Sequence, residues 1–496
     1  MRLTTVPTAM LLLTLLATGA AAQDAASVVA AASKAMGVDT LNAITYSGTA
    51  SNGAFGQSKA IGEPMGPVNV TTISRYTRTL TFGPAAEPAA LVSRATGPTQ
   101  PPTIPGVPAQ AAGVFNQNIT GAQAGSTWAQ ALNVWTTPWG FLKAAAGREA
   151  KVQRQGGLQV VSFSPANLTS PSGQTYTVTG YVNDQNLVTK VETRVDNAVV
   201  GDLLVEFDYS NYRSMNGVQV PGRIVQRQAG MQTFDATIDA ATPNPANLVE
   251  LLTPPPPAAG APAAPAAALP AAAASAPPVE KLGEGVFKIG GNYASLAVDM
   301  GDHILVVESG QSDGRGMAVM AAARQAIPGK TIRFVVNSHA HFDHASGLGA
   351  AVAEGATILT HRNNEQVLER LLAGPRTLIG DSLSKVPSRR KDVVQAVGDR
   401  DIRKGSNGKI VELHHAPNEH SDGMLVVYLP AEKLVWTADV SIVNSTPVQL
   451  ATVKAVAATL DRLKLDYTVW LPAHPPNPDR PLTKDDVVKA VGAAAP

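Results

Sequence analysis

The chain has 496 residues, more than one hydrophobic core usually organises, so we expect two or three domains. Hydrophobic residues make up 44% of the chain and charged residues 16%, which is typical of a globular protein and excludes a wholly disordered one. The net charge of +1 gives no basis for electrostatic binding to nucleic acid or to an anionic membrane. The chain has no cysteine, which excludes disulfide bonds and a cysteine-linked lipid anchor.

The N-terminus has the order of features that is typical of a secretory signal peptide. Arg2 precedes an apolar stretch over residues 9–17, and the small residues Ala20, Ala21 and Ala22 follow it. A membrane anchor is the alternative, but the apolar stretch is too short to span a bilayer comfortably. We therefore predict a signal peptide over residues 1–22, export to a periplasm or secretion, and no stable membrane span.

Residues 24–250 are predicted to form one β-rich domain. Helices are expected at 25–36 and 138–147, and residues 84–125, rich in Pro, Gly, Ala and Gln, read as a long loop or partly disordered insertion. Turn signals lie at 183–186 and 216–217. Strand-like runs occupy residues 43–49, 70–82, 151–163, 175–182, 187–195, 203–209 and 219–227. These runs indicate an antiparallel sheet, with the curvature of a half-barrel, and one or two helices against it.

One segment of this domain carries a family resemblance. Residues 205–212, followed by residues 217–221, resemble the half-barrel of periplasmic lipoprotein-carrier proteins. The domain contains no histidine cluster and no cysteine, so we expect it to have a role in binding or packing.

Residues 253–278 consist almost entirely of proline and alanine and carry no charge. Such a segment cannot bury enough apolar surface to form a core, and its prolines interrupt every candidate helix and favour an extended conformation. We predict a semi-rigid linker here.

Residues 280–496 alternate strands and helices. Antiparallel hairpins come first and strand-helix units follow, which is consistent with two packed sheets and helices outside them. Strands are expected at 285–290, 294–300, 303–308, 331–337, 357–360, 409–413, 424–428, 434–437 and 467–471, and helices at 314–327, 363–372 and 447–463.

A run of potential metal ligands follows the apolar segment 332–336. The run is His339, Ala340, His341, Phe342, Asp343 and His344, and none of the nine histidines of the chain precedes His303. His339 and His341 are two residues apart, so in an extended loop both side chains can reach one metal ion. Asp343 and His344 can reach a second ion beside the first.

Three further candidates lie beside predicted strands. His420 precedes the strand at 424–428, Asp439 follows the strand at 434–437, and His474 follows the last strand. Alone, Asp439 would be read as a helix cap or turn residue, and His474 as an ordinary loop histidine. Together with the histidine-rich run, these residues indicate a metal site.

These motifs resemble those of the metallo-β-lactamase-fold superfamily, over residues 286–475. The resemblance implies an α/β fold, an αββα sandwich, with two Zn²⁺ ions per chain. It implies that His339, His341 and His420 bind one zinc, that Asp343, His344 and His474 bind the other, and that Asp439 bridges both. Two positions depart from the family pattern: Glu308 stands where the early strand usually ends in Asp, and Pro475 replaces a glycine.

The implied function is a zinc-dependent hydrolase. A metal-activated hydroxide would attack an ester, lactone, thioester or amide of a small molecule, and Asp343 would orient the nucleophile and shuttle the proton. Asp439 and the missing cysteine count against most β-lactamase subclasses, although β-lactamase activity stays an alternative. An iron-dependent persulfide dioxygenase and a periplasmic ligand-binding protein with an accessory metal domain are further alternatives. His361, His414 and His415 are expected to be structural or surface residues, and the oligomeric state is left open.

Overall fold

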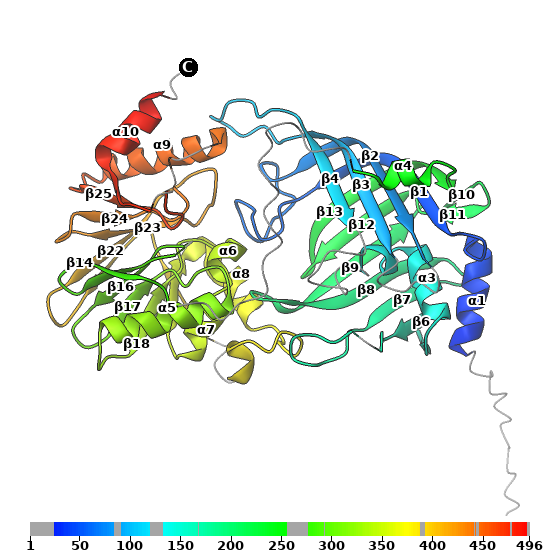
Figure 1. The fold of residues 1–496 in the computed structure, drawn as a ribbon, viewed down its shortest axis with the longest axis horizontal. Helices are drawn as coiled ribbons and strands as arrows, with labels where there is room; N and C mark the ends of the chain where they lie inside the picture. Colours follow the sequence, from blue (N-terminus) through cyan, green and yellow to red (C-terminus); the bar gives the residue numbers. More distant parts are fainter. Residues whose placement is uncertain are drawn as a thin grey trace, which may run out of the picture.

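The structure is a computed structural model of the chain. It describes residues 24–493 except 84–90, 120–131, 167, 255–275, 292, 387–391, 441, 443–445 and 477–478. The predicted signal peptide therefore lies outside the described residues, as does most of the predicted linker. The described chain forms a β-rich N-terminal region and a layered C-terminal region that lie side by side (Figure 1).

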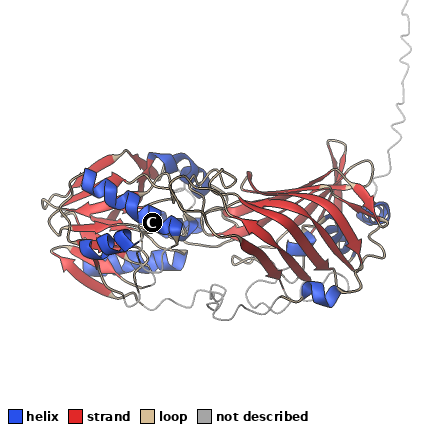
Figure 2. Cartoon of the chain, turned by 90° about the horizontal axis from the view of Figure 1, so that it is seen from above, coloured by secondary structure: helices blue, strands red, loops and turns tan. Residues whose placement is uncertain are grey.

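The N-terminal region is built on a large antiparallel sheet that curves like half a barrel (Figure 2). Its strand order is β4-β3-β2-β1-β13-β12-β9-β8-β7-β6-β5. These strands are β1 (Ala43–Asn52), β2 (Thr71–Thr81), β3 (Val92–Gln100), β4 (Gly113–Ile119), β5 (Lys151–Gln155), β6 (Leu158–Phe163), β7 (Val178–Val182), β8 (Val188–Asn197), β9 (Gly201–Ser210), β12 (Arg223–Gln228) and β13 (Met231–Pro243). A separate hairpin joins β10 (Arg213–Met215) to β11 (Val218–Val220).

The predicted antiparallel half-barrel is confirmed, but three details of its strands were wrong. Residues 84–125 are not simply a loop, because β3 and β4 form within them and extend the sheet edge. The single strand expected at 151–163 is two strands, since Gly156 and Gly157 both adopt positive φ and turn the chain. The strand expected at 219–227 breaks at Pro221 and Gly222 into β11 and β12. The long strand β13 was not predicted.

Two helices pack against this sheet. Asp24 caps the first turn of α1 (Ala25–Met36) and Gly37 ends it in the left-handed conformation. Helix α3 (Pro138–Ala146) begins after its cap Thr137 and buries Trp139 and Phe141. Both helices lie within a residue of their predicted positions, because each has clear end signals. A short helix α4 (Leu248–Leu252) ends the region.

The C-terminal region has two facing sheets. The first has the order β14-β15-β16-β17-β18-β19-β20 and the second β21-β22-β23-β24-β25-β26. The strands are β14 (Val279–Gly283), β15 (Val286–Ile289), β16 (Ser295–Asp299), β17 (Ile304–Val307), β18 (Ile332–Val336), β19 (Thr357–His361), β20 (Val394–Val397), β21 (Arg400–Lys404), β22 (Ile410–His415), β23 (Leu425–Leu429), β24 (Leu434–Trp436), β25 (Val469–Leu471) and β26 (Leu482–Thr483).

Helices cover the outer faces of both sheets, so the predicted αββα sandwich is confirmed (Figures 1 and 2). The helices are α5 (Asp313–Ala326), α6 (Phe342–Ala345), α7 (Leu348–Ala353), α8 (Arg362–Leu372), α9 (Pro447–Arg462) and α10 (Lys484–Ala493). Strand β17 is apolar at every position because both of its faces are buried. Leu305 and Val307 pack between the sheets, whereas Ile304 and Val306 pack under the helices. No helix in the described parts of the chain has the length and apolar character needed to cross a bilayer.

The two regions share an apolar cluster. Val199 and Leu203 of the N-terminal region belong to the same buried cluster as Leu371 and Leu372 of α8. Beside them, the Asp202 carboxylate accepts hydrogen bonds from the Thr377 hydroxyl, at 2.8 Å, and from the backbone N–H of residue 378, at 2.9 Å. The N-terminal region is therefore packed against the C-terminal one in addition to the chain connection.

Candidate metal centre

The histidine-rich run lies where predicted, directly after β18. His341 ends the extended loop, and the short helix α6 carries Asp343 and His344. The backbone N–H of Leu425 donates to the carbonyl oxygen of Ser338, at 2.7 Å, so β23 of the second sheet holds the start of the run. The run therefore lies at one edge of the sandwich, between the two sheets.

The Glu308 carboxylate binds the histidine-rich run from its buried side. It is fully buried at the end of β17 with φ of 68°. Its Oε2 accepts from the Ser338 hydroxyl, at 2.6 Å, and from Nδ1 of His344, at 3.0 Å. Nδ1 of His339 lies 3.0 Å from the Ser338 hydroxyl and donates to it, because that hydroxyl already donates to Glu308. One carboxylate thus orients two of the predicted ligands.

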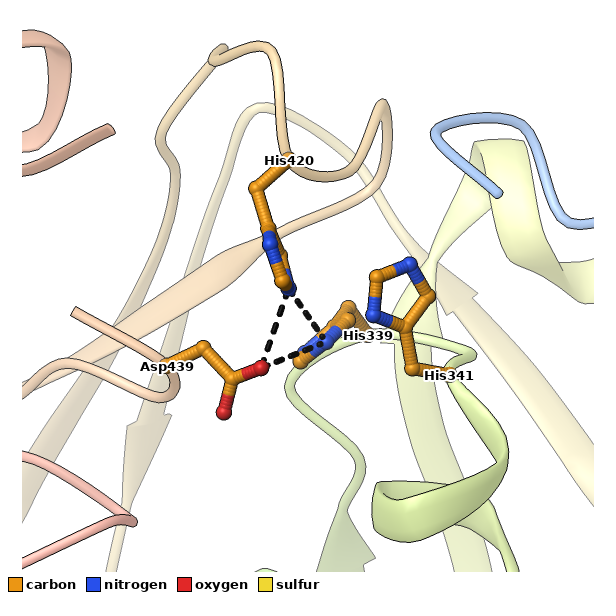
Figure 3. A group of neighbouring side chains, drawn as sticks. All are labelled: His339, His341, His420 and Asp439. Carbon is orange, nitrogen blue, oxygen red and sulfur yellow. Dashed lines mark hydrogen bonds and ion pairs between the residues drawn. The ribbon is translucent and has the colours of Figure 1, made fainter. Parts of the chain in front are cut away.

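Four predicted ligands form a first group: His339, His341, His420 and Asp439 (Figure 3). Each offers one ligand atom, and these atoms all lie within 4.8 Å of one another. Nε2 of His420 is 3.2 Å from Nε2 of His339 and 3.0 Å from Oδ2 of Asp439. The set offers three imidazoles and one carboxylate, a composition that suits a catalytic zinc site.

The remaining predicted ligands form a second group with the same aspartate: Asp343, His344, His474 and Asp439. Oδ1 of Asp439 is 2.6 Å from Nε2 of His344 and 2.6 Å from Nε2 of His474. Nε2 of His474 is 3.7 Å from Oδ2 of Asp343. Asp439 therefore turns one oxygen to each group, which is the arrangement of a bridging ligand.

Several buried atoms at the centre of these groups lack a hydrogen-bond partner. They are Nδ1 of His341, Nε2 of His344 and Oδ1 of Asp439. The last two lie only 2.6 Å apart, yet they do not meet the geometry of a hydrogen bond. Buried polar atoms are normally satisfied, and converging lone pairs are what a cation would satisfy. The donor set therefore fits metal ions.

The pKa shifts of three candidate ligands also favour a bound cation. Burial, with a smaller effect from His420, lowers the pKa of His341 to about 3, and burial holds the pKa of His339 well below its usual range. Both imidazoles are therefore neutral at pH 7 and offer lone pairs. Burial opposes ionisation of Asp439, but the nearby His344, followed by the close imidazoles of His420 and His474, holds its pKa well below the usual range. The site thus keeps its carboxylate charged and favours a cation.

A loop of the N-terminal region covers the site, and the sequence did not predict it. The carbonyl oxygen of Ser58 accepts from Nε2 of His341, at 3.1 Å, so the Nδ1 lone pair of that ring is free to face the group. Nε2 of Gln57 donates to Oδ1 of Asp343, at 2.7 Å. These partners lie more than 280 residues before the histidine-rich run, and no local motif marks them.

Tyr293 is a second feature that the sequence did not predict. Its hydroxyl donates to Oδ2 of Asp343, at 2.6 Å, and its ring lies edge-on to His474 with 4.4 Å between centroids. Burial, followed by the hydrogen bond to Asp343, raises the pKa of Tyr293, so its hydroxyl stays protonated as a donor. Asp343 is therefore held through both oxygens, by Gln57 and by Tyr293.

The other histidines lie outside both groups. Nε2 of His414 faces Glu412 at 3.0 Å. The rings of His361 and His415 stack with centroids 3.9 Å apart, and the carboxylate of Asp399 lies 3.6 Å from His361. Arg362 already pairs with that carboxylate, at 2.7 Å, and parallel rings do not aim two lone pairs at one point. We therefore assign no metal to this cluster.

Comparison with known families supports the fold. Residues 290–474 match the model of the Metallo-beta-lactamase superfamily. The C-terminal domain has the metallo-beta-lactamase fold. Every predicted ligand lies within the matched residues, so the resemblance that the motifs indicated is confirmed for this domain.

The chain also matches a curated relative. It is similar to the 2,4-dinitroanisole O-demethylase subunit alpha of Nocardioides sp. (strain JS1661), with 25% identity over 189 residues. The match covers 37% of this chain and 53% of the relative, so the chain spans about half the length of that protein.

Solved structures that are similar to part of this chain include lactamases and a sulfatase. A metallo-beta-lactamase from Erythrobacter litoralis is 16% identical, with 43% of this chain and 94% of that chain covered and a TM-score of 0.31. A metallo-beta-lactamase from Hirschia baltica is 16% identical, with 45% and 99% covered and a TM-score of 0.33. A stereoselective inverting sec-alkylsulfatase from Pseudomonas sp. is 16% identical, with 44% and 40% covered and a TM-score of 0.32.

Proposed function

We propose that the protein is an exported, dinuclear zinc-dependent hydrolase of small molecules. The observation that carries this proposal is the pair of ligand groups that share Asp439. His339, His341, His420 and Asp439 would hold one zinc ion, and Asp343, His344, His474 and Asp439 the other. Imidazole and carboxylate ligands without a thiol suit zinc, and the signal-peptide pattern at residues 1–22 supports export.

The residues around the groups define what the chain itself contributes. When bound, zinc supplies an activated water at neutral pH and polarises the oxygen of a substrate. Asp343 lies at the exposed side of the second group, where its ionised carboxylate can orient a nucleophile and pass on a proton. Burial opposes the ionisation of Asp343, but the neighbouring His344 and the hydrogen bond from Tyr293 lower its pKa.

The substrate classes follow from this chemistry. An ester, a lactone, a thioester or an amide presents a carbonyl carbon to the nucleophile, and β-lactams are a special case of the amide. The curated relative is named as an O-demethylase of an aryl ether, so a nitroaryl methyl ether is added to the classes to be tested. These substrates stay proposals, because one fold hosts several chemistries.

The first test measures metal content. The full chain is purified without chelator and analysed by inductively coupled plasma mass spectrometry. We expect about two zinc ions per chain, and a marked loss of bound zinc in His341→Ala. His303→Ala is the matched control, because His303 pairs with Asp302 away from both groups and should leave the zinc content unchanged.

The second test measures turnover on chromogenic ester, lactone, thioester, β-lactam and nitroanisole substrates. We expect hydrolysis of at least one substrate, with loss of activity in His341→Ala and retention in His303→Ala. A full zinc complement with no turnover across the panel would contradict the hydrolase proposal. One iron ion per chain in place of two zinc ions would favour the oxygenase alternative.

A further inference from the structure

A cavity of about 430 Å³ lies in the N-terminal region, and the function proposed above does not use it. Aromatic and apolar side chains form much of its wall, among them Tyr46, Tyr76, Phe115, Leu203, Phe207 and Phe234. Small-molecule sites usually measure about 300–1,000 Å³ and combine such walls with a few polar groups. The cavity has this size and this character.

The polar group that distinguishes the cavity is Arg78. It lies on β2 two residues after Tyr76, so both side chains reach the same face of the strand and both line the cavity. Its Nε donates to the Ser93 hydroxyl, at 3.2 Å, and its Nη2 donates to the carbonyl oxygen of Asn133. Both partners are neutral.

No carboxylate of the described residues pairs with this guanidinium. Asp196 also lines the cavity, but its Oδ1 accepts a hydrogen bond from the Tyr176 hydroxyl, and the groups that act on the charge of Arg78 are tyrosines. Arginine remains charged in proteins, and a charge removed from water is costly unless an anion compensates it. The guanidinium also interacts with the hydroxyls of Tyr46 and Tyr76, which are neutral as well. A carboxylate ligand would supply the anionic partner that these neutral contacts lack.

We propose that this cavity binds an amphipathic carboxylate, whose apolar body contacts the aromatic wall and whose carboxylate pairs with Arg78. The planar guanidinium matches a carboxylate in shape, and the partly buried setting of Arg78 strengthens that pairing. None of the predicted metal ligands lines the cavity, so the site is separate from the candidate metal centre. Its test therefore does not depend on the proposed hydrolase activity.

The test compares two probes on the full chain by isothermal titration calorimetry. Octanoate carries a carboxylate, and octan-1-ol has the same chain length without the charge. EDTA is present throughout so that octanoate cannot bind through a metal ion. We expect octanoate to bind at one site per chain, Arg78→Met to weaken it at least tenfold, and octan-1-ol to bind both proteins equally.

Two further variants make the result specific. Arg75→Met removes an exposed arginine of the same strand and should leave octanoate binding unchanged. Gln226→Trp fills the cavity while leaving Arg78 in place, and should abolish binding of both probes. Circular dichroism checks that each variant folds. If Arg78→Met fails to fold, Arg78→Lys replaces it and should keep octanoate binding while losing part of the affinity.

Three results would overturn the proposal. The first is that the wild-type chain does not bind octanoate at an octanoate concentration of about 10 mM. This concentration is about ten times the dissociation constant of a weak site, about 1 mM. The second is equal affinity of wild type and Arg78→Met for octanoate. The third is unchanged binding in Gln226→Trp, which would place the octanoate elsewhere on the molecule.

Discussion

Glu308 offers the sharpest test of how the candidate metal centre is held. The carboxylate is fully buried, and its Oε2 accepts from Ser338, at 2.6 Å, and from His344, at 3.0 Å. Glu308→Gln keeps the size of the side chain and the left-handed backbone but removes the charge. Hydrogen bonds to a charged group contribute about 1.5–3 kcal/mol and neutral ones about 0.5–1.5 kcal/mol, so each bond should lose about 1 kcal/mol.

Two such losses amount to about 2 kcal/mol, which corresponds to a decrease in zinc affinity of about 30-fold. This falls within the range of about 10–100-fold that is typical when the outer partner of a metal ligand is changed. Zinc affinity is measured by competition with a chromogenic chelator. Glu412→Gln is the control, since Glu412 bonds His414 outside both ligand groups. Zinc affinity of Glu308→Gln within twofold of wild type would refute the assigned role of Glu308.

Other perturbations separate the remaining contributions. Gly56→Ala would place a Cβ 2.7 Å from the ring of Phe342, so we expect its free energy of unfolding in urea to be about 1–3 kcal/mol lower than that of Gly106→Ala. Gly106 is the matched control, because it has a similar positive φ and open space around it. Equal free energies of unfolding would show that the contact with Phe342 is unimportant. Added zinc should raise the thermal midpoint of the wild-type chain and not that of His341→Ala, as followed by differential scanning calorimetry, because only a site that binds zinc in the folded state gains stability from it. Burial, with His415, lowers the pKa of His361 to about 4. The unfolded chain then binds a proton that the folded chain does not bind, so stability should fall as the pH decreases from about 6.5 to about 4. Urea unfolding of the chelated chain at pH 7 and pH 5 should show a smaller loss in His361→Asn than in wild type, and an equal loss would contradict this assignment.

The position of the candidate metal centre could be predicted because its signals are local. His339, His341, Asp343 and His344 lie within six consecutive residues, and His420, Asp439 and His474 each lie beside a strand with a clear apolar pattern. Strand ends meet at one edge of a sandwich, so the structure brings these seven side chains together in two groups. Glu308 lies beside the run because β17 and β18 are parallel neighbours, so the residues that follow each of them meet at the same edge of the sheet.

Other features could not be predicted, because tertiary pairing creates them. Strands β3 and β4 contain Gly97, Pro98 and Gly113, which weaken any strand signal, and they form because the edge of β2 offers backbone partners. Tyr293 is an isolated aromatic residue of a short connection between β15 and β16. Its role depends on the distance between its hydroxyl and Asp343, which no pattern within the connection encodes.

The loop from the N-terminal region changes how the two regions should be understood. The Gly56 carbonyl accepts from the backbone N–H of Phe342, at 2.9 Å, and the next two residues contact Asp343 and His341. Lys59 pairs with Glu419, at 2.8 Å, beside the loop of His420. Two of the four loops that carry candidate metal ligands, the histidine-rich run and the loop of His420, are therefore held from outside the C-terminal domain. Since the outer partner of a ligand sets its orientation, the N-terminal region contributes to the geometry of the candidate centre.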